Sequence, residues 1–169
     1  METKRLFFAL WPDDRQRDRL RNTLTPAARE LEGDAVLRGN WHVTLAFVGV
    51  FPAARIPELT TAAAGIAVEP FRLRFDRVDY WPRPRLGVLL APAVPAELER
   101  LVTALNGVLV AAGVAVDDRQ FRPHVTFLKR ARPFETARIG QPLDTSWDSF
   151  ELIESVPGPG GSTYRPLPR

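Results

Sequence analysis

The sequence predicts an α+β fold that forms one domain of two similar lobes over residues 1–169. Segments with strand-like alternation and segments with helical periodicity are interspersed along the chain, and no low-complexity linker divides it. One tetrapeptide pattern, His-Val-Thr-Leu/Phe, occurs once in each half, beginning at His42 and at His124. A chain of 169 residues also suits a single domain with a sizeable core.

Strands are predicted where apolar and polar residues alternate. The clearest is 71–79, with apolar residues at 71, 73 and 75 and polar residues between them. Segments rich in β-branched and aromatic residues predict further strands at 4–10, 40–48, 86–90, 121–129 and 149–156.

Helices are predicted at three places. The first begins around Pro12, Asp13 and Asp14, where proline and carboxylates suit a helix start, and extends to about residue 32 with an interruption near Pro26. Residues 57–66 are Ala-rich, and 95–112 have helical periodicity closed by Gly113. The Pro/Gly-rich residues 157–161 are predicted to form a turn or loop in a flexible tail.

Composition excludes several classes of protein. The chain has no cysteine, which excludes disulfides, thiolate nucleophiles and Cys-ligated metals. Its two histidines lack metal-site spacing, so neither a metal nor another cofactor is predicted. No long apolar run or signal peptide occurs, which predicts a cytoplasmic protein without a membrane segment. A net charge of +3 is compatible with a polyanionic partner.

The repeated motif predicts acid–base chemistry. Side chains at i and i+2 of a strand share a face, so His42 with Thr44, and His124 with Thr126, can point into a cleft. Two imidazoles that titrate near neutral pH suit a reaction in which water loses a proton while a leaving oxygen gains one. The threonine hydroxyls could stabilise charge on phosphoryl oxygens. Hydrolysis of a cyclic phosphodiester requires such a base, such an acid and such stabilisation of the phosphoryl oxygens.

A cation follows the second motif. Regular alternation would direct Arg130 to the histidine face and Lys129 to the opposite face, and a bulge at the strand end would reverse this choice. Either residue could hold phosphate by its charge.

Phe7 and Arg122 are weaker candidates for substrate contacts. Phe7 and Phe8 must face opposite sides of their strand, so one could stack on a terminal base while the other joins the core. Arg122 shares its alternation with His124 and Thr126, so it could line the cleft.

Nearly the whole chain resembles the two-histidine phosphoesterases, and specifically the bacterial and archaeal RNA 2′,3′-cyclic phosphodiesterases, also called 2′-5′ RNA ligases. The resemblance rests on the paired His-x-Thr motifs and on five segments: Arg5-Leu-Phe-Phe-Ala-Leu-Trp-Pro12, Trp41-His-Val-Thr-Leu-Ala-Phe-Val-Gly49, Trp81-Pro-Arg-Pro-Arg85, Phe121-Arg-Pro-His-Val-Thr-Phe-Leu128 and Phe150-Glu-Leu-Ile-Glu-Ser155. Family members often carry arginine where Lys129 stands. Lysine keeps the charge but loses the planar fork.

The resemblance implies a bilobal, pseudo-twofold fold in which two antiparallel sheets line a central cleft and the helices lie outside. It implies opening of a 2′,3′-cyclic phosphate at an RNA or nucleotide end to leave a 2′-phosphate. By analogy, His42 is the proton donor and His124 the proton acceptor. The alternatives are a 2′-5′ ligase that runs the reverse reaction, a phosphodiesterase for a small cyclic nucleotide or a carrier-linked phosphodiester, and a non-catalytic protein that binds RNA ends. A monomer is expected.

Overall fold

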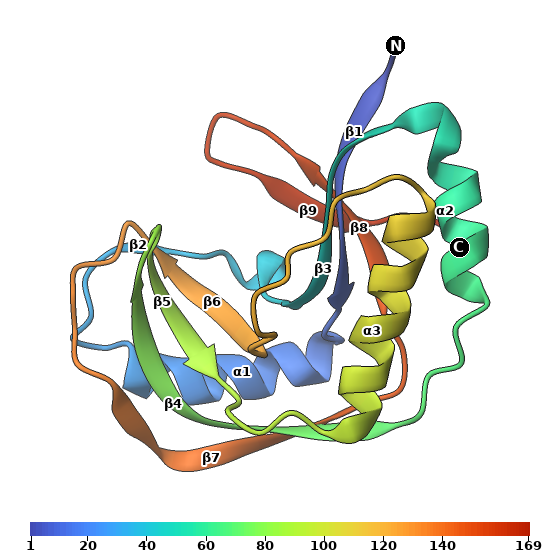
Figure 1. Ribbon diagram of the computed structural model, residues 1–169. Coiled ribbons are helices and arrows are strands. Elements are labelled where there is room, and N and C mark those ends of the chain that lie inside the picture. The colour runs from blue at the N-terminus through green and yellow to red at the C-terminus, as the bar shows by residue number, and fades with distance from the viewer.

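One of two antiparallel sheets contains both ends of the chain. The computed structural model describes all 169 residues. Four strands form this sheet in the order β3-β1-β8-β9: β1 (Thr3–Leu10), β3 (Val43–Pro52), β8 (Glu151–Val156) and β9 (Thr163–Pro166). In Figure 1 it lies beside the second sheet, with the β8–β9 hairpin projecting from it.

The second sheet has five strands in the order β2-β6-β5-β4-β7. They are β2 (Asp34–Ala35), β4 (Phe71–Pro82), β5 (Arg85–Leu90), β6 (His124–Lys129) and β7 (Ala137–Trp147). All pairings in both sheets are antiparallel. The predicted α+β class with two antiparallel sheets is confirmed.

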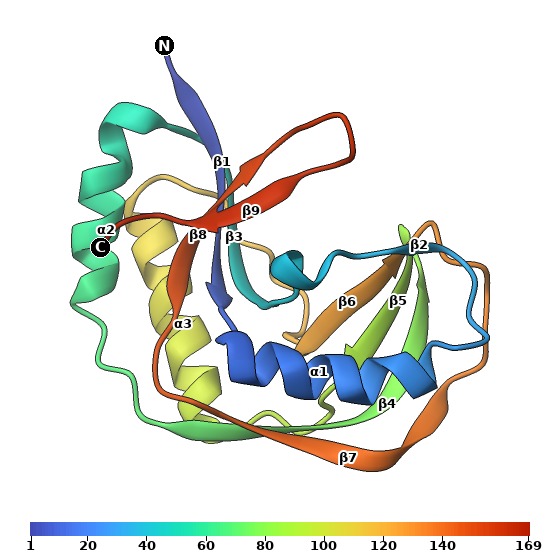
Figure 2. The same cartoon turned by 180° about the vertical axis from the view of Figure 1, so that it is seen from behind.

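The helices lie on the outer faces of the sheets. Helix α3 (Ala96–Ala111) packs against β3 and against α2 (Ile56–Ala64), and α1 (Asp14–Ala27) packs against β7. In Figure 2, α1 runs across the five-stranded sheet on the side that faces the viewer. Short 3-10 turns, η1 (Arg38–Asn40) and η2 (Ala53–Arg55), precede β3 and α2. No helix is both long and apolar enough to cross a membrane.

Helix α1 begins where the sequence predicts and ends earlier. The Asp13 carboxylate accepts a hydrogen bond from the Gln16 backbone N–H at 2.7 Å, and the Gln16 side chain accepts one from the Asp13 N–H at 2.8 Å. This reciprocal pair satisfies two N–H groups at the helix start. The helix ends at Ala27 instead of residue 32, one residue after Pro26, and the Ala28 N–H donates to the Leu24 carbonyl at its end.

The two lobes do not correspond to the two halves of the sequence. The four-stranded sheet takes β1 and β3 from the first half and β8 and β9 from the second, and the five-stranded sheet is similarly mixed. The chain therefore crosses repeatedly from one sheet to the other (Figure 1).

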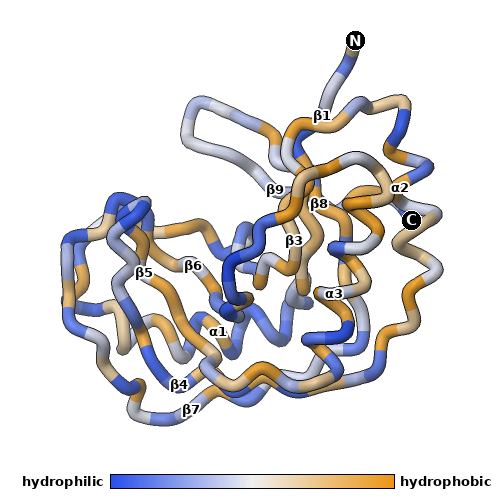
Figure 3. The backbone as a smooth tube through the Cα atoms, in the orientation of Figure 1, coloured by the Kyte–Doolittle hydropathy of each residue, from blue (hydrophilic) through white to orange (hydrophobic).

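One connected core joins the lobes. It contains 31 buried residues, including Val43 and Leu45 from β3 and Val125 and Phe127 from β6. Figure 3 shows hydrophobic segments on the strands of both sheets and along α3. In the two motifs, the histidine and threonine side chains alternate with four of these core residues, Val43, Leu45, Val125 and Phe127. The apolar half of each motif therefore anchors it in the core. We infer that the lobes fold as one unit.

Three strands have no counterpart among the predicted elements. The edge strand β7 contains Gly140 and Pro142, which interrupt a strand pattern but are tolerated at a sheet edge. Strand β9 pairs with β8, so residues 157–161 form a hairpin loop. The predicted turn or loop is confirmed, whereas the prediction of a flexible tail is wrong because the chain pairs again in β9. The third strand, β2, has only two residues.

Candidate active site

The first motif places His42 immediately before β3. Its Nδ1 lies 2.7 Å from the Asn40 carbonyl oxygen, and its Nε2 lies 2.9 Å from Thr44 Oγ1. Because a carbonyl oxygen only accepts, Nδ1 carries the proton and donates to it. In the neutral ring Nε2 then accepts from the threonine hydroxyl. His42 and Thr44 thus act as a connected pair, as strand alternation predicts.

The second motif repeats half of this arrangement. His124 is the first residue of β6, and its Nδ1 donates to the Arg122 carbonyl oxygen at 2.7 Å. In both motifs the carbonyl belongs to the residue two positions before the histidine. The Nε2 atom of His124 has no protein partner, and Thr126 is only partly buried on the same side of β6. This Nε2 is available to a water or a substrate.

The fold brings the two histidines into one site. Strand β3 of one sheet contacts β6 of the other. Burial lowers the pKa of His42 to about 4, against the opposing effect of the Asn40 carbonyl, and the charges of His124 and Lys129 lower the pKa further. Burial also lowers the pKa of His124, and the Arg122 charge acts in the same direction. Both rings are therefore neutral at pH 7 in the free protein.

The lowered pKa of His42 predicts acid-sensitive stability. Between pH 6.5 and about 4 the unfolded chain binds a proton at this ring that the folded chain does not. The free energy of unfolding should therefore fall with falling pH, by up to about 1.4 kcal/mol per pH unit. Urea unfolding of the native protein and of His42→Gln across this range tests the effect. The variant should lose less stability on acidification, and parallel curves would contradict this origin.

A bulge determines which cation reaches the cleft. Gly87 pairs with Leu128 and Val88 with Thr126, so Phe127 is an extra residue in β6. A Cβ atom on Gly87 would lie 3.1 Å from the Leu128 Cβ and 3.3 Å from Phe127 Cζ, so glycine permits this close approach. Beyond Phe127, side chains of β6 therefore point to the face opposite to the one that regular alternation predicts.

Lys129, and not Arg130, therefore lies on the histidine side. Its Nζ is 3.5 Å from the Tyr164 hydroxyl and 5.9 Å from the centre of that ring, and its charge acts on His42. Arg130 has a positive φ of 47° and pairs with Asp34 on β2, with its Nε 2.6 Å from the carboxylate. The placement of Arg130 expected from regular alternation is wrong.

Phe7 packs against His42 and is not free to stack on a base. Its side chain is only 5% exposed, and its ring centre lies 4.7 Å from that of His42 and 5.2 Å from that of Tyr164. These neighbours cover the ring, which corrects the prediction that Phe7 could contact a terminal base. Its observed contacts support the histidine.

Arg122 contacts the second histidine through an aromatic ring. Its guanidinium lies 4.8 Å from the centre of the Trp81 ring and 3.8 Å from the Asp79 carboxylate. The Trp81 ring in turn lies 4.3 Å from that of His124. The prediction placed Arg122 near His124 but did not include Trp81. Trp81 belongs to β4 because it pairs with Leu86 on β5.

Asn40 and Trp11 are further residues that the sequence interpretation did not select. The Asn40 side chain donates to the Ser162 carbonyl at 2.9 Å and accepts from the Tyr164 N–H at 3.1 Å. Asn40 thereby connects the β8–β9 hairpin to His42. Trp11 stacks on His42 with ring centres 6.2 Å apart. No local sequence signal identifies these residues, because the contacts join segments distant in sequence.

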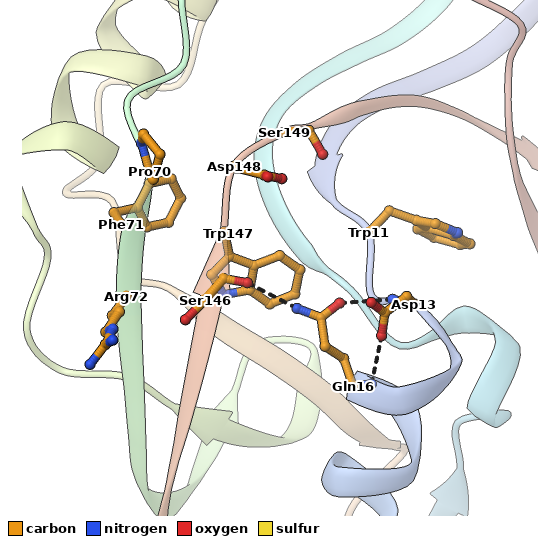
Figure 4. A pocket seen from close by; sticks show the side chains of 10 residues that line it. All are labelled: Trp11, Asp13, Gln16, Pro70, Phe71, Arg72, Ser146, Trp147, Asp148 and Ser149. Atoms are coloured by element: carbon orange, nitrogen blue, oxygen red, sulfur yellow. Dashed lines mark hydrogen bonds between the residues drawn. The ribbon is translucent and has the colours of Figure 1, made fainter.

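One hollow in the structure is separate from the histidine pair. It measures about 630 Å³ and is bounded by three segments that cross between the lobes: the chain around Trp11–Gln16, the start of β4, and residues 146–149. Figure 4 shows that none of the predicted site residues lines it, although Trp11 does. Gln16 spans one side by donating to the Ser146 carbonyl at 3.1 Å.

The structure contains no group of three or more His, Asp or Glu side chains that could hold a metal ion. The groups assembled around the histidine pair are the two imidazoles, two threonine hydroxyls and the Lys129 ammonium. Together they can transfer protons and hold an oxyanion.

Comparison with known proteins gives concordant results. Residues 10–89 match the family model for LigT-like phosphoesterases. RNA 2′,3′-cyclic phosphodiesterase of Escherichia coli is 29% identical over 99% of this chain and 96% of its own length. The protein of that name from Archaeoglobus fulgidus is 27% identical, covering 96% and 97%. The crystal structure of E. coli LigT with 3′-AMP superposes with a TM-score of 0.88 at 28% identity, covering 99% and 97%. The chain is thus similar to the LigT-like phosphoesterases over residues 10–89 and to RNA 2′,3′-cyclic phosphodiesterases over nearly its whole length.

Proposed function

We propose that this protein hydrolyses the 2′,3′-cyclic phosphate at an RNA or nucleotide end and leaves a 2′-phosphomonoester. The observation that carries the proposal is the pair of His-x-Thr motifs, which lie near each other where β3 of one sheet contacts β6 of the other. The names of the relatives from E. coli and A. fulgidus agree with this substrate.

His124 is the proton acceptor in this proposal. Its Nδ1–H is held by the Arg122 carbonyl, so the unprotonated Nε2 is directed to the reacting water. The water oxygen attacks phosphorus as its proton passes to Nε2. Because the pKa of this ring is lowered, the required neutral form predominates at pH 7.

His42 is the proton donor. The P–O3′ bond breaks as the His42 Nε2 proton passes to the departing 3′-oxygen, so the protons balance. The free ring is mostly neutral because its pKa is about 4. A bound phosphodiester brings a negative charge beside the ring, which favours the protonated form. Hydrolysis then leaves the proton on His124, and exchange with water restores the starting state.

Thr44, Thr126 and Lys129 stabilise the phosphoryl oxygens. When His42 is protonated, the Thr44 hydroxyl no longer needs to donate to Nε2 and is released to donate to the phosphate. Lys129 supplies a positive charge without an opposing carboxylate, in contrast to Arg130 with Asp34. Proton transfer and these fixed donors require no metal ion in the proposed mechanism.

A direct assay tests this function. We expect chelator-treated protein to convert 2′,3′-cyclic AMP to 2′-AMP, identified by chromatography against 2′- and 3′-AMP standards. Loss of activity with chelator and its recovery on adding a divalent metal would overturn the metal-free mechanism. Formation of 3′-AMP would show that the other ester bond breaks. A cytoplasmic location and a monomeric state stay predictions from the sequence.

A further inference from the structure

The cleft face of the four-stranded sheet continues beyond the histidine pair as a row of cross-strand pairs between β1 and β3. Ala9 lies opposite Thr44, Phe7 opposite Phe47, and Arg5 opposite Val50. Successive pairs on one face of a strand are about 7 Å apart. The row begins at Thr44 and runs toward Arg5, and the spacing between its pairs is similar to that between neighbouring nucleotides.

Phe47 and Val50 are unusually exposed along this row. Their side chains are 67% and 65% exposed, although both are large and apolar. An isolated exposed apolar residue is ordinary on a protein surface. These two lie together on one face, and the Phe47 ring is 6.3 Å from that of Phe7, which itself packs on His42. The exposed surface is thus continuous with the active site.

The charges beside this apolar surface suit a polyanion. Arg5 is exposed and forms no ion pair, whereas Lys4 on the other face of β1 is paired with Glu154. Lys129 supplies a second unpaired cation at the catalytic end, next to Tyr164. An aromatic surface between two free cations has the features of single-stranded nucleic acid sites, where bases stack on rings and phosphates meet positive charge.

We propose that this face, defined by Phe47, Val50 and Arg5, binds the RNA chain on the 5′ side of the reacting end. A base stacks on the Phe47 ring, and a backbone phosphate pairs with Arg5. This inference rests on the proposed function for the position of the reacting end. It adds that the substrate is a single-stranded RNA chain in preference to a free cyclic nucleotide.

Binding of the product distinguishes the two substrate classes. The probes are a hexa-adenylate that ends in a 2′-phosphate, followed by fluorescence anisotropy, and 2′-AMP, followed by calorimetry. Phe47→Ala should raise the Kd for the hexanucleotide about thirtyfold, in line with loss of one stacked base. The Kd for 2′-AMP should change less than about twofold. Phe47→Trp should retain tight binding of the hexanucleotide.

Arg5→Ala gives an independent readout. Removing one phosphate contact should make the slope of log Kobs against log salt concentration shallower by about 0.7 for the hexanucleotide. Val110→Ala is the matched control, since Val110 is 60% exposed on α3, and it should change neither the affinity nor the slope.

Several outcomes would overturn the inference. One is an unchanged hexanucleotide affinity in Phe47→Ala, and another is an equal loss for 2′-AMP and the hexanucleotide. A third is self-association of the native protein that Phe47→Ala abolishes without affecting RNA, which would assign the face to a second copy of the chain. Because these are binding measurements, they remain decisive if the native protein fails to hydrolyse cyclic AMP. That failure would count against the proposed function alone.

Discussion

Replacing His124 with alanine is expected to reduce kcat on a 2′,3′-cyclic phosphate about a thousandfold. The variant lacks the Nε2 that has no protein partner in the folded chain and that accepts the proton of the attacking water in the proposed mechanism. His42→Ala should cause a loss of similar size, because the leaving 3′-oxygen would then depart without a proton. Single-turnover rates at saturating substrate measure both effects without a contribution from product release.

The double variant, His42→Ala with His124→Ala, shows whether the losses in kcat from the two single variants add. If the two rings act in one concerted transfer, removing both should cost little more than removing either one. His42 and His124 lie among buried residues, so circular dichroism and thermal unfolding must first show that the variants fold. A folded His124→Ala protein within tenfold of native activity would contradict its role as base.

Lys129→Ala is expected to lower kcat/KM about thirtyfold, as loss of one charge-assisted contact to phosphate predicts. The side chain has no carboxylate partner, and its charge already reaches His42 in the free protein. Removing that charge leaves the phosphoryl oxygens without their nearest cation. Steady-state kinetics on 2′,3′-cyclic AMP at fixed ionic strength measures the effect.

Arg130→Ala is the matched control for Lys129→Ala. Its guanidinium is held by Asp34 on β2, so its removal should change kcat/KM less than about threefold. Lys129→Arg keeps the charge and should retain most of the activity. The assignment of the phosphate contact would be wrong if Arg130→Ala had the larger effect.

The extent to which the sequence predicts the site depends on whether an interaction is local. His42 and Thr44 are two residues apart, and a period of two places them on one face whatever the surrounding fold. The same reasoning applies to His124 and Thr126. Lys129 is also near in sequence, but the bulge at Phe127 intervenes. That bulge requires a close approach to Gly87 on a neighbouring strand, which the local pattern does not reveal.

The fold shows the same distinction. The amphipathic helix α3 and the alternating strand β4 carry their own periodicity, and both are predicted near their observed positions. Strand β7 contains Gly140 and Pro142 and extends because β4 supplies its hydrogen-bonding partner. Asn40 has no distinguishing pattern, since its effect on His42 is through a backbone carbonyl that any residue possesses.

The crossing of the chain between the sheets has a consequence for its synthesis. Strand β1 is made long before its neighbour β8, because most of the described chain lies between them. A nascent chain that ends before Glu151 already contains both histidines. It lacks the strand that completes the sheet beside His42, and it lacks Tyr164 and the hairpin that Asn40 binds. We therefore expect catalytic competence only after β8 and β9 have been made, so truncated products that end before them would carry both motifs without an assembled site.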